Sequence, residues 1–367
     1  MGVSVDSEVV SQKAIPDVKI AMDDRIDLRS DFLSRPTEAM IEAMFVAISK
    51  PPSTGRDEDP VVKKLESLAA EMLGKEEALF CPTCTMCNQI AVNTLCKRGD
   101  ILLAPTKAHV LTSEGGAAAA LSGVQIVTLE TKRGQMSPTF LEAALIPEAR
   151  DGRPSVGLIL IENTHLRSGG CVVPESIMRK TAEIAAANGV PVHLDGSRMF
   201  NAAAFLGVEP INLACHADTV SISLNKGLSA PVGALLAGSS ELIKTAVEIR
   251  QQFGGGWQSP GVLAAAGIVA LEQMTSNLAA DNENARKLAF GLNQMDGLSI
   301  LNDPVETNVL LIGIEYSETA RDSFLDRLAQ KGVLLMPYDE GTIRAVVHKD
   351  HSSDDIDRVI RVIKRTM

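Results

Sequence analysis

The sequence has few aromatic residues, an excess of acidic over basic residues, and no long apolar run. Aromatic residues make up 3% of its 367 residues, and the formal net charge is −11. With no stripe of lysine and arginine, this charge argues against nucleic acid or an anionic membrane as a partner. The longest apolar runs, such as 262–271, are much shorter than a bilayer span, and residues 1–20 lack the apolar centre of a signal peptide. We therefore expect a cytoplasmic protein.

Two other absences narrow the class of protein. No Gly-x-Gly-x-x-Gly turn follows an early strand, which argues against a nicotinamide dehydrogenase. No secretory signal accompanies the six cysteines, so we expect reduced thiols rather than disulfides. The 45% hydrophobic content is instead typical of an α/β enzyme with a large core, and the length allows a second, smaller domain.

From residue 77 onward, short apolar segments alternate with helical patterns. The pattern predicts strands at 78–80, 101–103, 125–127, 156–162, 190–195 and 219–224. Beyond these strands and the helices between them, longer helices are expected at 262–275 and 278–294. This βαβ rhythm predicts an α/β fold with a mostly parallel sheet and helices on both faces. We divide the chain into an N-terminal arm at 1–25, a large domain at 26–277 and a small α+β domain at 278–367.

A lysine and an aspartate follow two of these predicted strands. Strand 190–195 ends in Asp195, and strand 219–224 is followed by Lys226 and then by a glycine that breaks the regular structure. Ligands of parallel α/β sheets gather at the carboxyl ends of the strands. Pyridoxal phosphate needs an acid beside its ring nitrogen and an amine for its aldehyde. The sequence therefore predicts pyridoxal 5'-phosphate as the cofactor.

The phosphate of such a cofactor is best held by amides and hydroxyls at a helix N-terminus. Thr83, Cys84 and Thr85 lie between a predicted strand and a predicted helix. Thr83 is equally a candidate for an ordinary helix cap, and the two roles are compatible. Cys81, Cys84 and Cys87 form a C-x-x-C-x-x-C run, so an iron–sulfur or zinc site is the alternative. The missing fourth ligand favours buried thiols instead.

Two histidines and an arginine are further candidates. His109 precedes Glu114 and two glycines, and its imidazole suits stacking on a pyridine ring, with a structural role as the alternative. His165 follows the apolar strand at 156–162, at an edge where reacting groups gather. Arg344 lies in an apolar segment, so it needs an anion, either a carboxylate of the fold or one of a substrate.

Together these motifs resemble the low-specificity L-threonine aldolases, in the β-eliminating lyase/threonine aldolase group of fold-type-I pyridoxal-phosphate enzymes. The resemblance covers nearly the whole chain from Ile26. Several separated motifs in one order make it specific. The segments that carry it are 26–31, 58–60, 82–88, 109–116, 162–165, 169–170, 194–202, 226–233 and 254–256.

The resemblance implies a fold-type-I architecture and roles at the cofactor. Lys226 would bond covalently to the cofactor, Asp195 would pair with its ring nitrogen, and His109 would stack on its ring. Arg198 is implied at the same site. The reaction implied is cleavage of the Cα–Cβ bond of a β-hydroxy-α-amino acid, such as L-threonine or L-allo-threonine, to glycine and an aldehyde. The alternatives are β-elimination or racemisation on the same cofactor, and a non-catalytic relative.

The resemblance also implies how a substrate would be held. Ser30, Arg198 and Arg344 would bind its carboxylate, and His165 would act near the β-hydroxyl, directly or through water, as a general base. Members of the family usually form homotetramers with active sites at a dimer interface, so a homo-oligomer with shared sites is implied here.

Five residues depart from the usual pattern of this family. Arg56 replaces a tyrosine, Ser113 an aromatic residue, Phe32 a threonine, Cys84 a glycine, and Gln258 an arginine that usually contacts the phosphate. Arg56 and Ser113 are expected to make the substrate pocket more polar and to favour an anionic side chain. Threonine itself is then not necessarily the natural substrate.

Overall fold

The computed structural model describes residues 24–51, 58–145, 154–315 and 317–367. Its larger part is built around a seven-stranded sheet in the order β2-β10-β9-β8-β7-β3-β4. Every neighbouring pair is parallel except β10 with β2 and β10 with β9. The bounds are β2 (Glu77–Cys81), β3 (Ile101–Pro105), β4 (Gln125–Leu129), β7 (Val156–Glu162), β8 (Val192–Gly196), β9 (Thr219–Ser223) and β10 (Ala234–Gly238).

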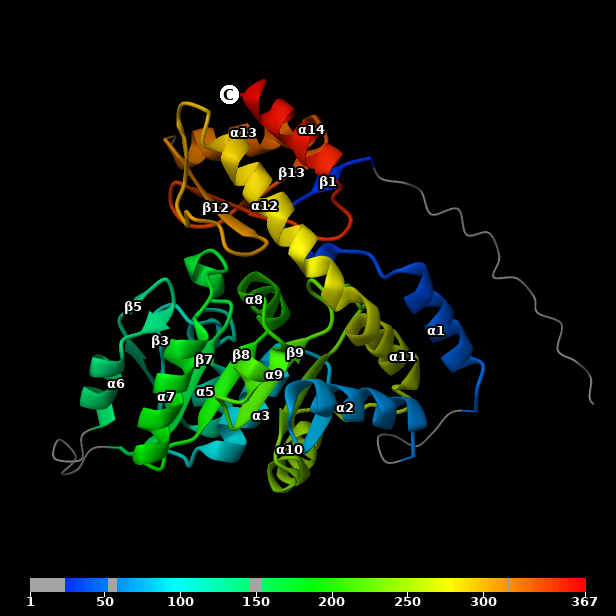
Figure 1. Ribbon diagram of the computed structural model, residues 1–367, viewed down its shortest axis with the longest axis vertical. Coiled ribbons are helices and arrows are strands. Elements are labelled where there is room, and N and C mark those ends of the chain that lie inside the picture. The colour runs from blue at the N-terminus through cyan, green and yellow to red at the C-terminus, as the bar shows by residue number, and fades with distance from the viewer. Residues whose placement is uncertain (1–23, 52–57, 146–153, 316) are drawn as a thin grey trace, which may run out of the picture.

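Helices cover both faces of this sheet, as the sequence predicts (Figure 1). Successive strand residues point to opposite faces, so Phe80 joins a core cluster with α2, α7 and α8, whereas Leu79 joins one with α3 and α10. Because both faces are covered, β8 and β9 are buried throughout. The bounds of these helices are α2 (Pro60–Leu73), α3 (Cys84–Leu95), α7 (Glu175–Ala187), α8 (Met199–Leu206) and α10 (Ser240–Gln252).

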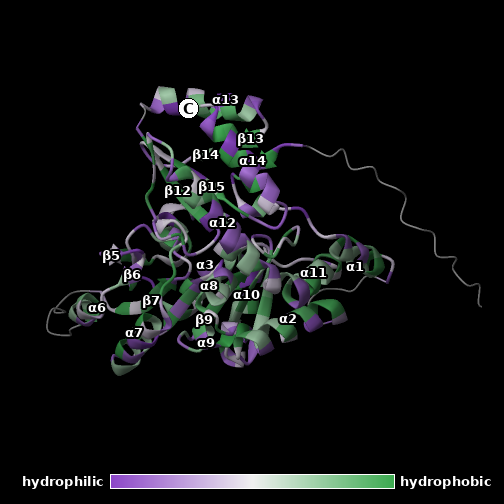
Figure 2. Cartoon of the chain, turned by 45° about the horizontal axis from the view of Figure 1, so that its top comes forward, coloured by the Kyte–Doolittle hydropathy of each residue, from purple (hydrophilic) through white to green (hydrophobic). Residues whose placement is uncertain are grey.

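Shorter elements complete the larger part. Helix α1 begins after Thr37, whose side chain accepts a hydrogen bond from the Met40 amide. Hydropathy follows the same layering, because apolar residues concentrate along the strands of the central sheet (Figure 2). The remaining elements are α1 (Glu38–Ile48), α4 (His109–Thr112), α5 (Ala117–Ser122), β5 (Thr131–Lys132), β6 (Gln135–Met136), α6 (Pro138–Leu145) and α9 (Pro210–Ala214).

The smaller part has its own core around a four-stranded antiparallel sheet in the order β11-β12-β15-β14. The segment 26–28, which the sequence division assigns to the large domain, belongs to this core instead. Strand β1 (Ile26–Asp27) pairs with β13 (Val333–Leu334), a long-range contact that no local pattern reveals. The other bounds are β11 (Leu298–Ile300), β12 (Val309–Ile314), β14 (Met336–Pro337), β15 (Thr342–Val346), α13 (Glu318–Gln330) and α14 (Ser353–Lys364).

One continuous helical segment, 261–292, runs from the larger part to the smaller (Figure 1). It comprises α11 (Gly261–Val269), a π-helical turn at Ala270–Met274, a 3-10 turn at Thr275–Asn277 and α12 (Leu278–Leu292). Among the described helices it alone has the length and hydropathy for a membrane span, yet 56% of its most apolar window is buried inside the protein. The same properties are found in the core helices of soluble proteins. The two helices expected from the sequence are therefore present, joined by a π-helical turn and a 3-10 turn into one helical segment.

Candidate active site

A cavity of about 320 Å³ collects most of the predicted site residues. It lies beyond the carboxyl ends of β3, β7, β8 and β9, where parallel sheets bind ligands. From the smaller part, Arg344 of β15 and Tyr338, in the turn between β14 and β15, close it. Its lining residues are Ser30, Phe32, Thr83, Cys84, Thr85, His109, Ser113, Leu166, Arg167, Arg198, Ser223, Asn225, Lys226, Tyr338 and Arg344.

Lys226 lines this cavity from the loop after β9. Its carbonyl oxygen accepts hydrogen bonds from the Ser229 amide at 2.9 Å and from the Ser34 hydroxyl at 3.3 Å, so the loop backbone is held from both sides. No hydrogen bond or ion pair joins its Nζ to another residue within the described ranges. An amine held at a strand end, with no partner in the part of the chain that the structure describes, is suited to bond with a ligand aldehyde.

Asp195 ends β8 and is 2% exposed. Its carboxylate accepts hydrogen bonds from the Asn88 side-chain amide at 2.8 Å and the Ser197 amide at 3.1 Å. Burial by itself raises the pKa of Asp195, but the charges of His109 and Lys226 outweigh it and hold the pKa below its usual value. In the described part of the chain, Asp195 forms no ion pair with arginine or lysine. A buried carboxylate of this kind fits a cationic ring nitrogen.

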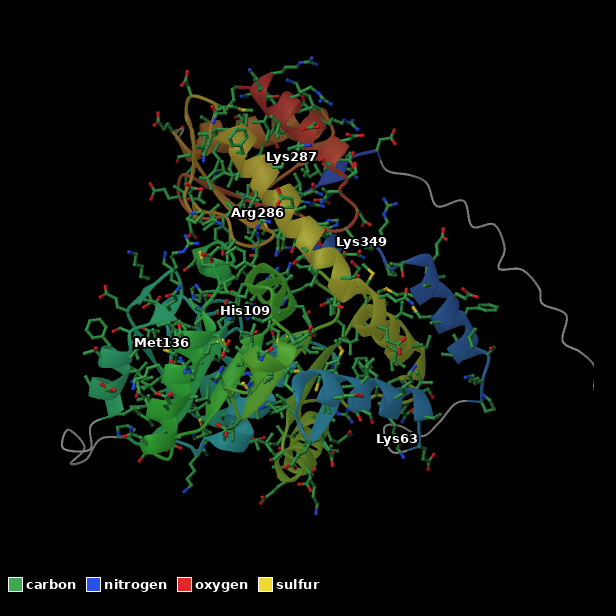
Figure 3. The ribbon with its side chains drawn as sticks, in the orientation of Figure 1. Lys63, His109, Met136, Arg286, Lys287 and Lys349 are labelled. Atoms are coloured by element: carbon green, nitrogen blue, oxygen red, sulfur yellow. The ribbon has the colours of Figure 1, made fainter. Side chains whose placement is uncertain are left out.

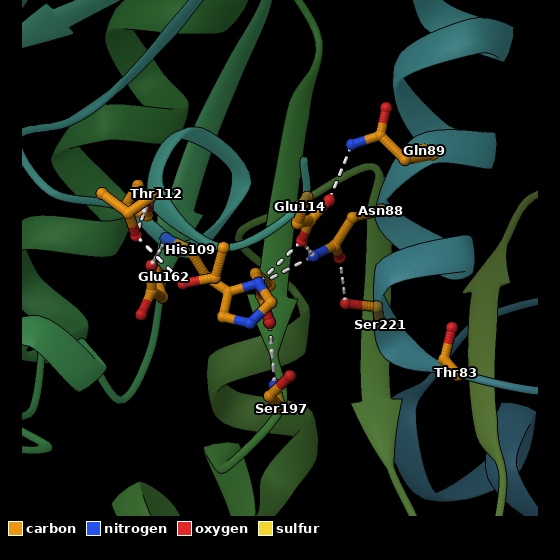
Figure 4. Close-up of polar contacts among 12 residues, drawn as sticks. Thr83, Asn88, Gln89, His109, Thr112, Glu114, Glu162, Ser197 and Ser221 are labelled. Carbon is orange, nitrogen blue, oxygen red and sulfur yellow. Dashed lines mark hydrogen bonds and ion pairs between the residues drawn. The ribbon is translucent and has the colours of Figure 1, made fainter. Parts of the chain in front are cut away.

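His109 is anchored by a network that the sequence does not reveal (Figure 4). Its Nδ1 lies 2.8 Å from Glu114 Oε1, and Glu114 accepts further hydrogen bonds from Asn88 at 2.8 Å and Gln89 at 2.6 Å. Burial lowers the pKa of His109, but the bond to Glu114 and the charge of Asp195 raise it above its usual value. Because Asn88 donates to both Glu114 and Asp195, it sets the position of the histidine relative to the acid.

The position of His109 also favours a cofactor role over a merely structural one. The histidine lies at the end of the central sheet that faces the smaller part (Figure 3). Its backbone amide donates a hydrogen bond to the Glu162 carboxylate at 2.6 Å, which fixes the main chain, and its side chain lines the cavity. His193 is fully buried, with its Nδ1 2.8 Å from the Thr219 hydroxyl and its Nε2 3.0 Å from Asn88 Oδ1, so it supports the same network.

The three cysteines of the C-x-x-C-x-x-C run are buried thiols, the alternative that the sequence favours. Burial raises the pKa of Cys84 to about 11 and also raises that of Cys87. Cys81, Cys84 and Cys87 pack in an apolar core cluster. Ligand atoms of His109, Glu114 and Asp195 do lie within 4.8 Å of one another, but Asn88 and Gln89 already donate to these carboxylates.

Thr83 is a helix cap and a cavity residue at once. Its hydroxyl accepts a hydrogen bond from the Met86 amide at 3.1 Å at the start of α3. Thr83, Cys84 and Thr85 all line the cavity. The first amides of an α-helix have no partner within the helix and bind anions, so the two roles coexist at this terminus.

Arg198 forms a buried, bidentate ion pair with Asp31. Its Nε and Nη2 each donate to one carboxylate oxygen at 2.7 Å. Burial raises the pKa of Asp31, but Arg198, Lys226 and Asn308 hold it well below its usual range. Arg198 still lines the cavity beside Ser30, yet two of its donors are committed to the fold. Its role as a carboxylate clamp is thus smaller than the resemblance implies.

Arg344 has more donors available. Its Nη2 donates to the Arg29 carbonyl oxygen at 3.1 Å, and its guanidinium lies 5.1 Å from the centre of the Tyr338 ring. The buried Nε has no hydrogen-bond partner in the described residues, and no carboxylate of the fold there forms an ion pair with this arginine. Of the two alternatives for its anion, the substrate carboxylate is the one that the arrangement favours.

His165 lies beside the cavity rather than on its surface. It is 1% exposed, its Nδ1 lies 2.8 Å from the Ser168 hydroxyl, and its Nε2 has no partner among the described residues. The next two residues, Leu166 and Arg167, line the cavity, whereas His165 is not among the described lining residues. Any contact with a substrate hydroxyl would therefore pass through water or a small movement.

The departures from the family pattern divide by position. Phe32, Cys84 and Ser113 all line the cavity, as expected. Gln258 is exposed and is not one of the described lining residues. Arg56 belongs to the segment 52–57, outside the described residues, so its expected role stays a prediction.

The fold and the site define a fold-type-I enzyme of the kind that uses pyridoxal phosphate. A family model, beta-eliminating lyase, matches residues 27–315, and the chain belongs to that family. It is 38% identical to low-specificity L-threonine aldolase 1 of Arabidopsis thaliana, over 93% of this chain and 96% of the relative. It is 33% identical to the low specificity L-threonine aldolase of Escherichia coli K12, over 91% and 97%. The threonine aldolase structure from Leishmania major superposes with a TM-score of 0.80 at 20% identity, covering 92% and 98%.

Proposed function

We propose that this protein is a pyridoxal-phosphate-dependent lyase that cleaves the Cα–Cβ bond of a β-hydroxy-α-amino acid to glycine and an aldehyde. The observation that carries the proposal is the placement of Lys226 and Asp195 at the carboxyl ends of the adjacent parallel strands β9 and β8, near an Arg344 Nε that has no partner among the described residues. The full-length relatives are named as threonine aldolases, which supports this reaction over others on the same cofactor.

The residues present fit the cofactor. When bound, pyridoxal phosphate draws electrons away from the bond that breaks. Lys226 would provide the amine that bonds to it, and Asp195, whose carboxylate is held ionised, would keep a proton on its ring nitrogen. Thr83 and Thr85, which line the cavity at the start of α3, would hold its phosphate. His109, fixed through Glu114, lines the cavity where a ring would lie.

The remaining residues hold the substrate and move its proton. Arg344 and Ser30, with the free edge of Arg198, bind the α-carboxylate and so fix the orientation of the Cα–Cβ bond. The β-hydroxyl must lose a proton as the aldehyde forms. His165 is the base that we assign to this step, because its Nε2 has no other partner among described residues and a water can link it to the cavity.

A direct test is to incubate the purified, cofactor-loaded protein with L-threonine and L-allo-threonine and to measure glycine and acetaldehyde. We expect equal amounts of the two products. Lys226→Ala is expected to remove the reaction, since the amine has no substitute nearby. Ammonia with a keto acid would instead indicate β-elimination, and an inverted amino acid would indicate racemisation. A protein that binds the cofactor and converts none of these substrates would be a non-catalytic relative.

We also propose that the protein is a cytoplasmic homotetramer with active sites shared between subunits. The sequence resemblance supports this assembly. A further support is the outer face of α1, where Ile41, Phe45, Val46 and Ile48 are each between 41% and 69% exposed. Apolar clusters on a surface commonly mark an interface. Light scattering would give the molar mass, and a monomer at micromolar concentration would contradict the proposal.

A further inference from the structure

Arg167 is a cation in the cavity that the proposed chemistry does not use. It lies in the 3-10 turn Leu166–Ser168 after β7. The ion pair it makes with Asp339 is a single contact of 3.3 Å, and the Asp339 side chain is 50% exposed. Exposed pairs of this kind contribute little free energy. The charge of Arg167 is therefore largely available to a ligand.

The charges of the cavity walls lead to the same residue. Among its described lining residues, four are cationic and none is an aspartate or a glutamate. Arg198 is paired with Asp31, Lys226 is needed for the cofactor, and Arg344 is the clamp for the α-carboxylate. The cofactor phosphate belongs at the α3 terminus. Arg167 is the cation that remains, so the cavity has one positive charge available to bind a further anion.

Tyr338 fixes where that anion would lie. Its ring, in the turn between β14 and β15, has the Arg167 guanidinium 4.7 Å and the Arg344 guanidinium 5.1 Å from its centre. Both cations thus flank one aromatic ring, which holds them by cation–π attraction. Since both arginines line the same cavity next to this ring, a substrate bound to Arg344 through its α-carboxylate would extend its side chain towards Arg167. The two carboxylate carbons of a four-carbon amino acid are three bonds apart, a separation that suits two neighbouring guanidinium groups.

We propose that Arg167 binds a carboxylate on the substrate side chain, so that the preferred substrate is a β-hydroxyaspartate. This inference rests on the proposed function of the cavity. In the reaction the Cα–Cβ bond breaks and the β-hydroxyl gives up its proton to a base. The β-carbon becomes the aldehyde carbon of glyoxylate, and the electron pair left on Cα takes up a proton to give glycine. A guanidinium suits this role because it binds carboxylates in a bidentate manner.

Equilibrium binding tests the inference without any turnover. L-aspartate and L-asparagine have nearly the same shape, differ in charge, and lack the β-hydroxyl required for aldol cleavage. We expect the cofactor-loaded protein to bind aspartate about 10- to 100-fold more tightly, the range for a lost hydrogen bond to a charged group. Arg167→Gln should abolish this preference, and Arg167→Lys should keep part of it. The matched control is Arg286→Gln, which removes an arginine paired with Glu283 on α12 in the smaller part (Figure 3).

Kinetics then separate the inference from the proposed function. Arg167→Gln should raise KM for β-hydroxyaspartate about 10- to 100-fold and raise KM for threonine far less, because threonine has no side-chain carboxylate. Equal binding of aspartate and asparagine by the unaltered protein, or equal losses for both substrates in the variant, would overturn the role of Arg167. If no β-hydroxy amino acid is cleaved but the aspartate preference still depends on Arg167, the anion subsite stands and the proposed reaction fails.

Discussion

The two ends of the cavity differ in how fully their polar groups are satisfied within the fold. At the cofactor end, Asn88 links Asp195 to Glu114, and Glu114 in turn fixes His109. At the substrate end, Arg344 keeps an unpartnered Nε in the described structure, and the ion pair of Arg167 is with a half-exposed aspartate. A preorganised hydrogen-bond network suits a cofactor, which is the same in every turnover. Cations with few partners in the fold suit the binding of an anionic substrate group. The substrate end is therefore where this chain sets its specificity.

The largest effect is expected from Asp195→Asn at the cofactor end. The change keeps the size of the side chain but removes the charge that stabilises a protonated ring nitrogen, so kcat should fall about 10²- to 10³-fold. The cofactor should remain attached to Lys226, which an absorbance spectrum of the variant would test. Asp218→Asn, at the opposite end of the sheet next to β9, is the control and should retain activity. Full activity of Asp195→Asn would show that the cofactor end does not work as described.

Arg344→Gln should produce the next largest effect, at the other end of the cavity. Loss of the carboxylate clamp is expected to raise KM about 10- to 100-fold for every amino acid substrate. The dissociation constant of the cofactor should not change, because Arg344 belongs to the substrate end. Fluorescence titration of the cofactor and steady-state kinetics measure the two quantities separately. If the variant also lost cofactor affinity, the assignment of Arg344 to the substrate end of the cavity would be wrong.

The buried His193 gives the cofactor end a stability that depends on pH. Burial lowers the pKa of His193 from 6.5 to about 4 in the folded protein. Between these values the unfolded chain binds more protons, so the free energy of unfolding falls as pH decreases from 6.5 to 4. The contribution lost is on the order of 2 kcal/mol. Urea unfolding at several pH values should show this slope, and His193→Gln should reduce it; an unchanged slope in the variant would contradict the assignment.

The smallest effect is expected from Thr83→Ala. Loss of the cap on α3 should lower the free energy of unfolding by about 1 kcal/mol. Because the same hydroxyl lines the phosphate side of the cavity, cofactor affinity should fall by a few-fold at most. Thr83→Ser retains the hydroxyl and should behave as the unaltered protein does. If only stability changes, Thr83 is a cap and the phosphate is held by the amides alone.

The sequence predicts the cofactor end better than the substrate end, for a physical reason. Lys226 and Asp195 follow apolar strands, and the parallel order brings strand ends together, so local patterns suffice to place them. Arg167 and Tyr338 are far apart in sequence, and no periodicity signals that they meet. The same holds for the ion pair of Asp31 with Arg198, which only the folded chain brings together.

The fold shows the same division between local and long-range information. Apolar runs of strand length identify β7, β8 and β9. The sequence does not predict strand β10 clearly, since its short apolar run is compatible with a helix or a strand. It lies antiparallel between β2 and β9, an order that depends on the whole sheet. The pairing of β1 with β13 likewise follows from packing of the smaller core.

The most direct test of the central claim is to reduce the cofactor-loaded protein with borohydride, digest it and locate the modified residue by mass spectrometry. A Schiff base between the cofactor and a lysine becomes a stable bond on reduction. The account predicts the added mass of the reduced cofactor on the peptide that contains Lys226, and on that peptide alone. An unmodified Lys226, or the same mass on another lysine, would contradict it.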